Sequence, residues 1–129
     1  MASRAATISH PSTSGGTTRD VMLVTWTGLT KATDDYGAAV QVPALADRSV
    51  QVIGALGVGG SVRIEGSNKA VPGEAVPADW AVLTDPQGNN LDISAPKIES
   101  VTEPVLWIRP RVTAGDGTTD FTVILLLRK

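Results

Sequence analysis

The sequence predicts an all-β fold, an antiparallel β-sandwich or jelly roll that follows an extended N-terminal arm. From residue 20 onward the apolar residues recur with period two, which is the side-chain alternation of a β-strand. Turn-forming residues separate these runs, and the 8 prolines and 13 glycines recur at intervals that would break most long helices. Roughly eight or nine short strands within one domain are typical of two packed sheets.

The first 19 residues read as an arm rather than as part of the sandwich. Serine, threonine, glycine and alanine dominate this segment, and 12–18 is nearly low in complexity. Such a segment buries too little apolar area to offset the entropy lost on ordering. We therefore place the domain boundary between an arm over 1–19 and a sandwich over 20–129. Two alternatives remain open for the arm: a partner or neighbouring subunit holds it, or it packs along its own domain.

Four strands are expected in the first half of the sandwich. The first is rich in β-forming residues and ends at Gly28, and the second is the weakest candidate. The third and fourth alternate cleanly and are separated by a glycine-rich stretch. Their ranges are 20–27, 36–43, 47–53 and 61–65.

The second half ends in the strongest strands. A short strand over 80–84 stops at a turn over 85–89, and brief strands follow over 91–93 and 98–101. The strand over 105–113 has Leu106, Ile108 and Val112 on one face and Trp107, Arg109 and Arg111 on the other. Ala114-Gly115-Asp116-Gly117 then forms a tight connection to a final strand over 118–129, which predicts a hairpin.

The final strand is apolar on both faces. Phe121, Val123, Leu125 and Leu127 share one face, and Ile124 and Leu126 share the other. A central strand that is buried on both sides explains this pattern, and so does an interface in a symmetric oligomer.

The composition argues against several classes of protein. The net charge is −2, with 11 basic and 13 acidic residues, whereas nucleic-acid binding needs a concentrated positive field. The absence of cysteine excludes disulfides and thiolate chemistry, and it fits folding in a reducing cytoplasm. No signal-peptide pattern is visible, and the longest apolar run, 123–127, is too short for a membrane span. We expect neither nucleic acid nor membrane as a partner.

No set of residues predicts catalysis. The single histidine, His10, lies in the arm, where it would not be held against a nucleophile, so we interpret it as a solvated or interface residue. Asp34 and Asp35 are adjacent and would point to opposite faces of a strand. Asp116 and Asp120 could hold calcium, although Asp-Gly is more often a turn. We expect no enzyme activity, no metal and no cofactor.

The aromatic residues are few, and we expect most of them in the core. Trp80 and Phe121 lie in apolar strand patterns. Trp107 shares a face with Arg109 and Arg111, a composition that is enriched at interface hot spots. An arginine stacked over a half-buried ring of the same molecule would explain the pattern equally well.

Two segments carry a resemblance to a known group of proteins. One runs Val62-Arg63-Ile64-Glu65-Gly66-Ser67-Asn68 and continues to Trp80-Ala81-Val82-Leu83-Thr84, and the other runs from Leu106 through Arg109-Pro110-Arg111-Val112 to a glycine-rich hairpin. Over roughly 48–129 the chain resembles small structural proteins of tailed-bacteriophage head gene clusters. The resemblance implies a capsid decoration (cement) protein with a β-sandwich fold. Such proteins clamp neighbouring major capsid subunits on the outer head, and many are trimers.

The first segment also resembles galactose-binding-like sandwiches of the discoidin type. This chain departs from that pattern, because Lys69 follows Asn68 and a proline-rich insert over 70–77 lengthens the loop before Trp80. The departure puts glycan binding in doubt and suggests that the loop makes contacts of its own.

The resulting hypothesis is a virion structural protein that binds across junctions of the major capsid protein and stabilises the head. It would be made in the host cytoplasm, act on the outer capsid surface and form a homo-oligomer, with a trimer favoured. The alternative is a carbohydrate-binding or host-attachment module on a head or tail fibre, for which an exposed pair of Trp26 and Trp107 would be the mark. The residues expected to contact partners lie in the arm, the 70–77 loop and one face of the 105–113 strand: Arg4, Ile8, His10, Arg19, Val71, Pro72, Glu74, Trp107, Arg109 and Arg111.

Overall fold

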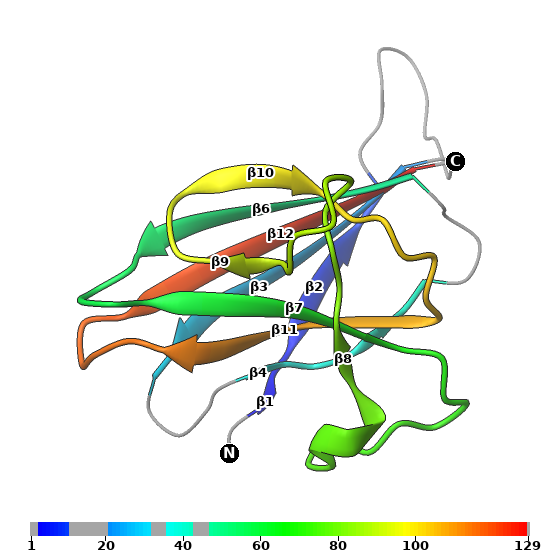
Figure 1. Cartoon of the computed structure of the whole chain (residues 1–129), viewed down its shortest axis with the longest axis horizontal. Coiled ribbons are helices and arrows are strands. Elements are labelled where there is room, and N and C mark those ends of the chain that lie inside the picture. Colours follow the sequence, from blue (N-terminus) through cyan, green and yellow to red (C-terminus); the bar gives the residue numbers. More distant parts are fainter. Residues whose placement is uncertain (1–2, 11–20, 32–35, 43–46, 129) are drawn as a thin grey trace.

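Two β-sheets pack against each other and enclose one hydrophobic core (Figure 1). The computed structural model describes residues 3–10, 21–31, 36–42 and 47–128. Within this part of the chain the only helical element is a three-residue 3-10 turn, Pro77–Asp79. The predicted all-β sandwich is therefore confirmed.

The first sheet has seven strands in the order β1-β4-β11-β7-β8, with β5 pairing β11 and β9 pairing β7. Its longest strands, β7 and β11, are antiparallel neighbours, and β1 and β4 form a parallel pair. The strands are β1 (Ser3–Arg4), β4 (Tyr36–Gly37), β5 (Val40–Gln41), β7 (Ser61–Ser67), β8 (Ala81–Val82), β9 (Asp92–Ile93) and β11 (Trp107–Ala114).

The second sheet has five antiparallel strands in the order β10-β6-β12-β3-β2. They are β2 (Ala6–Ser9), β3 (Val21–Thr30), β6 (Asp47–Ala55), β10 (Lys97–Ser100) and β12 (Asp120–Arg128). The central strand is β12, which pairs with β3 on one side and β6 on the other. Its central position explains why its sequence is apolar on both faces.

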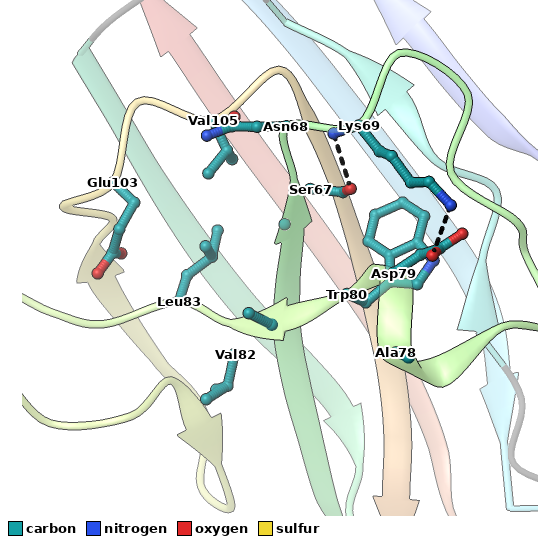
Figure 2. Close-up of a pocket in the computed structure, with 12 residues that line it drawn as sticks. Ser67, Asn68, Lys69, Ala78, Asp79, Trp80, Val82, Leu83, Glu103 and Val105 are labelled. Carbon is teal, nitrogen blue, oxygen red and sulfur yellow. Dashed lines mark hydrogen bonds and ion pairs between the residues drawn. The ribbon is translucent and has the colours of Figure 1, made fainter.

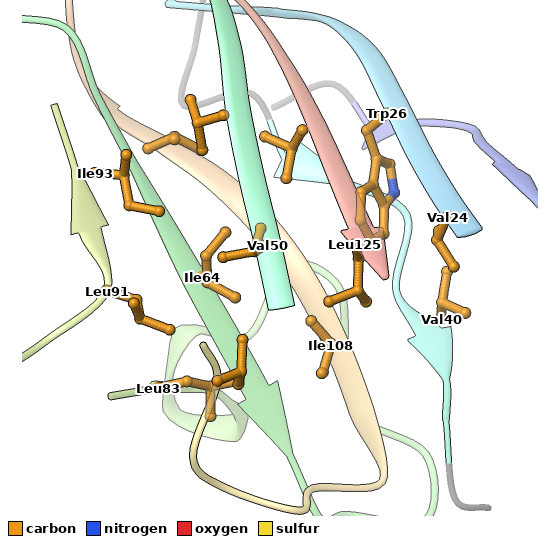
Figure 3. Close-up of a cluster of buried hydrophobic side chains, with 14 of the residues drawn as sticks. Val24, Trp26, Val40, Val50, Ile64, Leu83, Leu91, Ile93, Ile108 and Leu125 are labelled. Carbon is orange, nitrogen blue, oxygen red and sulfur yellow. The ribbon is translucent and has the colours of Figure 1, made fainter. Parts of the chain in front are cut away.

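The core lies between the sheets, where the inward-facing residues of both layers meet (Figure 3). On β12 the inward side chains of Phe121, Val123, Leu125 and Leu127 are fully buried, as their alternation predicts. On β11, Ile108 and Val112 point into the core, and Trp107, Arg109 and Arg111 point out of it, as expected from the pleat. Each fully buried aliphatic side chain contributes about 1.5–3 kcal/mol through removal from water.

One predicted strand end is wrong, because β3 continues through Gly28 to Thr30. Gly28 has φ = 67°, and the register against β12 shifts between Phe121 and Val123. Thr27 and Gly28 together oppose one residue of β12, which is a β-bulge. A glycine can adopt this left-handed conformation without a Cβ clash, so it bends the strand here instead of ending it.

The described part of the arm, 3–9, packs along its own domain and does not extend away from it. Strand β1 pairs with β4 in the seven-stranded sheet, and β2 pairs with β3 in the five-stranded sheet. The chain therefore crosses from one sheet to the other over these residues, seen as the blue segment in Figure 1. We call 3–9 the N-terminal strap. Its backbone pairing supports the second of the two alternatives for the arm, packing along its own domain, while 11–20 lies outside the described residues.

Candidate interaction surfaces

A buried ion pair organises the outer face of the seven-stranded sheet. Arg109 on β11 is directly opposite Glu65 on β7, and both side chains point away from the core. Arg109 Nε donates to Glu65 Oε1 at 3.0 Å, and Arg111 Nε donates to Glu65 Oε2 at 3.2 Å. One carboxylate thus lies between two guanidinium groups, an arrangement in which charge-assisted hydrogen bonds offset the cost of burial.

Two aromatic rings cover the Arg109 guanidinium. Its Cζ atom lies 4.7 Å from the centre of the Tyr36 ring and 4.1 Å from that of Trp80, so both contacts are cation–π interactions. Arg109 is only 2% exposed. Burial lowers the pKa of this guanidinium, and the nearby Glu65 carboxylate opposes that shift. Trp80 is buried, as expected, and its ring packs over the guanidinium of Arg109, so Arg109 is not available to a partner.

The same arginine holds the loop that connects β7 to β8, residues 68–80. Arg109 Nη1 donates to the Glu74 carbonyl at 2.7 Å, and Trp80 Nε1 donates to the Gly73 carbonyl at 2.9 Å. Asp79 accepts from the Gly73 amide at 2.8 Å and from Lys69 Nζ at 2.9 Å. These donors lower the pKa of Asp79, with the Gly73 amide contributing most. Hydrogen bonds within the loop therefore fix its shape, and Arg109 fixes it to the domain.

This fixed 68–80 loop presents apolar side chains to solvent. Val71 is 83% exposed and Val76 is 45% exposed. Ala70, Ala75 and Ala78 are also exposed. None of these side chains packs in the hydrophobic core, so the fold does not require apolar residues at these positions.

A hollow of about 570 Å³ lies between the loop, β8 and 103–105 (Figure 2). Trp80, Val82, Leu83 and Val105 form most of its apolar lining, and Figure 2 shows Glu103 at the side opposite Lys69. Glu103 accepts hydrogen bonds from the amide and the hydroxyl group of Thr84. Burial alone would raise the pKa of Glu103, but these two donors outweigh it and the pKa is lowered.

The polar groups around this hollow are largely committed to the fold. Asn68 Oδ1 accepts from the Leu106 amide at 3.0 Å, and Ser67 Oγ accepts from the Lys69 amide at 3.2 Å. The hollow has the apolar lining and the size to receive a side chain or a small apolar group.

The outer face of the five-stranded sheet carries no charged side chain along its middle. The residues that alternate with the buried ones on these strands define this surface, which we call the neutral face. Charged groups lie only at the strand ends, where Asp47 and Arg128 form an ion pair at 2.9 Å at one end and Asp120 lies at the other. The described residues of the neutral face are Thr7, Ser9, Leu23, Thr25, Thr27, Ser49, Gln51, Ile53, Ile98, Ser100, Thr122, Ile124 and Leu126.

The residues predicted to contact partners fall into two separate groups. Arg4, Val71, Pro72, Glu74, Trp107, Arg109 and Arg111 all belong to the seven-stranded sheet or to its loop. Ser3 Oγ lies 3.5 Å from Glu74 Oε1, which brings the strap next to the loop. Ile8, 51% exposed, and His10, which is also exposed, lie at the edge of the five-stranded sheet. Arg19 lies outside the described residues.

The tryptophan pair expected of a carbohydrate-binding module is absent. Trp26 is 1% exposed, and its Nε1 donates to the Ala38 carbonyl at 3.0 Å. Tyr36, Trp80 and Phe121 are also buried, and Trp107 is half-buried with its Nε1 enclosed and without a partner. No flat aromatic platform is therefore presented on the surface.

The acidic residues considered as calcium ligands have other roles or lie outside the described part. Asp116 accepts from the amide and hydroxyl of Thr118 and from the Val58 amide, and these contacts, the Thr118 hydroxyl first, lower its pKa to about 2. Asp34 and Asp35 are not described. Within the described ranges, no three histidine or acidic residues gather closely enough to hold a metal ion. The same ranges contain no helix with the length and apolar character needed to span a membrane.

Comparison with known proteins adds no relative. No protein-family model, curated protein or solved structure matches the chain. Functional interpretation therefore depends on the two surfaces described above, the 68–80 loop and the neutral face. The composition of the loop was visible in the sequence. The neutral face was not recognised beyond Ile124 and Leu126, because it is assembled from five strands whose register only the fold defines.

Proposed function

We propose that this chain is a virion structural protein, a capsid decoration (cement) protein that binds across junctions of the major capsid protein and stabilises the head. The observation that carries the proposal is the rigid 68–80 loop, which presents Val71 and Val76 to solvent and has no role in the core. An exposed apolar group on a fixed support is the arrangement expected of a protein-binding site.

Preorganisation explains how a small loop could bind with useful affinity. Ordering a mobile loop on binding costs about 0.5–1.5 kcal/mol for each immobilised side chain. Here Arg109, Trp80 and Asp79 already hold the loop in the free protein. Most of the ordering free energy is therefore spent when the chain folds and not when it binds. A binder of the assembled shell then stabilises it by mass action, since every bound copy favours the assembled state over the dissociated one.

The wider context of the proposal comes from the resemblance over 48–129 to head proteins of tailed bacteriophages. It names the major capsid protein as the partner, the outer surface of the virion as the location and the host cytoplasm as the place of synthesis. It also makes a homo-oligomer the expected form, with a trimer as the commonest arrangement in that group. The buried aromatic rings give no support to the alternative of a carbohydrate-binding module.

The proposal is tested with heads assembled from the major capsid protein of the same head gene cluster. Purified chain is added to the expanded shells, and co-sedimentation and shell melting are measured. We expect saturable binding, a higher melting temperature for the shells, and a loss of at least about tenfold in affinity for Val71→Asp.

The matched control is Val58→Asp, which places the same charge on an equally exposed valine, 82% against 83%, away from the loop. It should bind like the unmodified chain. Failure of the unmodified chain to bind such shells would refute the capsid proposal. Equal binding by Val71→Asp and Val58→Asp would show that the 68–80 loop does not make the capsid contact.

A further inference from the structure

The neutral face is unusual for the outer surface of a sheet. Strands exposed to solvent normally alternate apolar residues with polar and charged ones, which keeps the sheet soluble. Here the middle of the face has only threonine, serine, glutamine, leucine and isoleucine among the described residues. Ile98 is 63% exposed and Ile53 is 39% exposed, so water contacts apolar surface that a partner could cover.

The strand register divides this face into rows that run across the sheet. Ile98 pairs with Gln51, Gln51 with Ile124, Ile124 with Thr25, and Thr25 with Thr7. This row crosses β12 at its central residue, because β12 runs from Asp120 to Arg128. The rows on either side contain Leu126 beside Leu23, and Thr122 beside Ile53.

The charges at the ends of the face complement each other under a two-fold rotation about this central row. The rotation reverses the strands, so each residue of β12 faces the one equally distant from Ile124 on the opposite side. Arg128 of one copy then lies over Asp120 of the other, and Leu126 lies over Thr122. This unlike-charge contact forms twice, and Asp47, which pairs with Arg128 in its own copy, lies over Ala55 of the other. Ile124 and Ile98 each face their own counterparts. A self-complementary patch of this kind is what an isologous interface requires.

The size of the face also suits a dimer. Five strands spaced about 4.8 Å apart, with about 3.4 Å for each residue of the longest strand, give a face on the order of 700 Å². Stable interfaces bury about 800 Å² on each partner. Sheets that pack face to face lie about 10 Å apart, close enough for side chains of this size to interdigitate.

We propose that two copies of this chain pack face to face through the neutral face, with the two-fold axis along the row from Ile98 to Thr7. This assigns the self-association a two-fold contact instead of the trimer that the resemblance implies. The proposed interface lies on the five-stranded sheet, whereas Arg109 and the 68–80 loop lie on the seven-stranded sheet. The dimer proposal therefore does not depend on the capsid proposal.

The test measures the mass of the full chain in solution by sedimentation equilibrium between about 5 and 200 µM, the range in which a micromolar dimer dissociates. We expect a species of twice 13.4 kDa at the upper end. Ile124→Lys puts two like charges on the axis and should raise the dissociation constant at least about a hundredfold. Ile98→Lys also places two like charges on the axis. It lies on the exposed edge strand β10, so it should not disturb folding. Val58→Lys adds the same charge outside the face and should change nothing.

Several outcomes would overturn the dimer. They are a 13.4 kDa species at every concentration, a dimer that survives both Ile98→Lys and Ile124→Lys, and a trimer. Val71→Asp, which tests the capsid proposal, should leave the mass unchanged. Loss of capsid binding with an intact dimer would therefore be separable from loss of the dimer itself.

Discussion

Arg109 and Glu65 show how far the stability of this domain depends on individual side chains. The side chain of Glu65 is 6% exposed and that of Arg109 is 2% exposed. Removing one partner of such a pair leaves a buried charge uncompensated, which costs far more than the pair contributes as a whole. The energetic role of Arg109 is therefore to balance Glu65 and to anchor the 68–80 loop at the same time.

We predict that Arg109→Met lowers the free energy of unfolding by roughly 3 kcal/mol, measured by urea denaturation. Arg63→Gln is the comparison, because it breaks the half-exposed pair with Asp92 and should cost about 1 kcal/mol or less. The double variant Arg109→Met with Glu65→Leu should recover part of the loss, since the only charge that loses its partner is then Arg111, whose side chain is 25% exposed. Equal costs for Arg109→Met and Arg63→Gln would contradict this account.

Asp116 predicts a pH dependence at the residue scale. Its pKa is about 2 in the folded chain, against the ordinary value of 3.8. A depressed pKa means that the unfolded state binds protons first, so this contribution is complete above pH 3.8 and is lost as the pH falls toward 2. In Asp116→Asn, the decline in stability that this group causes between pH 3.8 and about 2 should be absent.

Thr118→Val provides the second measurement, because the Thr118 hydroxyl is the largest contributor to the lowered pKa of Asp116. The decline in urea midpoint should then still begin near pH 3.8, because the unfolded-state pKa is unchanged, but it should be smaller and end at a higher pH than in the unmodified chain. An identical profile for the unmodified chain and both variants would show that Asp116 is not the titrating group.

At the scale of elements, the N-terminal strap covers exposed sheet edges. Strand β2 pairs with β3, and Ala6, which is the partner of Trp26 in this pairing, packs against the core. Without it, β3 would present unpaired amide and carbonyl groups at an open edge, which invites pairing with another chain.

We predict that deleting residues 1–9 leaves a folded sandwich with a lower melting temperature and a greater tendency to aggregate. Circular dichroism and light scattering during heating would measure both effects. Ile8→Ser is the matched control, since it removes an exposed side chain and keeps the backbone pairing to Val24. A deletion that melts and scatters like the full chain would show that the strap does not protect the edge.

The elements also show what the sequence could and could not predict. Alternation identified β6, β7, β11 and β12 and the faces they turn to the core, because burial on one side imposes period two. The sequence left open whether the arm packs along its own domain, because the strap strands are held mainly by backbone hydrogen bonds, which leave no apolar pattern in Ser, Thr and Ala residues. The continuation of β3 through Gly28 was missed because a bulge glycine looks like a turn glycine in sequence.

On the scale of the whole molecule, the missed features all depend on contacts between distant segments. The residues around Arg109, namely Tyr36, Glu65, Glu74 and Trp80, come from three parts of the chain: β4, β7 and the 68–80 loop. The sequence placed Arg109 on an outward face and allowed an arginine of that face to stack on a ring of the same molecule, but it did not identify the two rings and the loop that cover Arg109. The neutral face has the same origin, because it exists only once β10, β6, β12, β3 and β2 are in register.

The two surfaces lie on opposite sides of the sandwich. The 68–80 loop is anchored over the outer face of the seven-stranded sheet, and the neutral face is the outer surface of the other sheet. A dimer formed through the neutral face would therefore leave both loops uncovered.

The most direct test of the proposed capsid role is an electron cryomicroscopy reconstruction of a tailed-phage particle that contains this chain. The account predicts that the sandwich lies on the outer surface at junctions between major capsid subunits, with Val71 and Val76 against the shell. Density for the chain in the tail or neck, or on the shell with the 68–80 loop facing solvent, would contradict it.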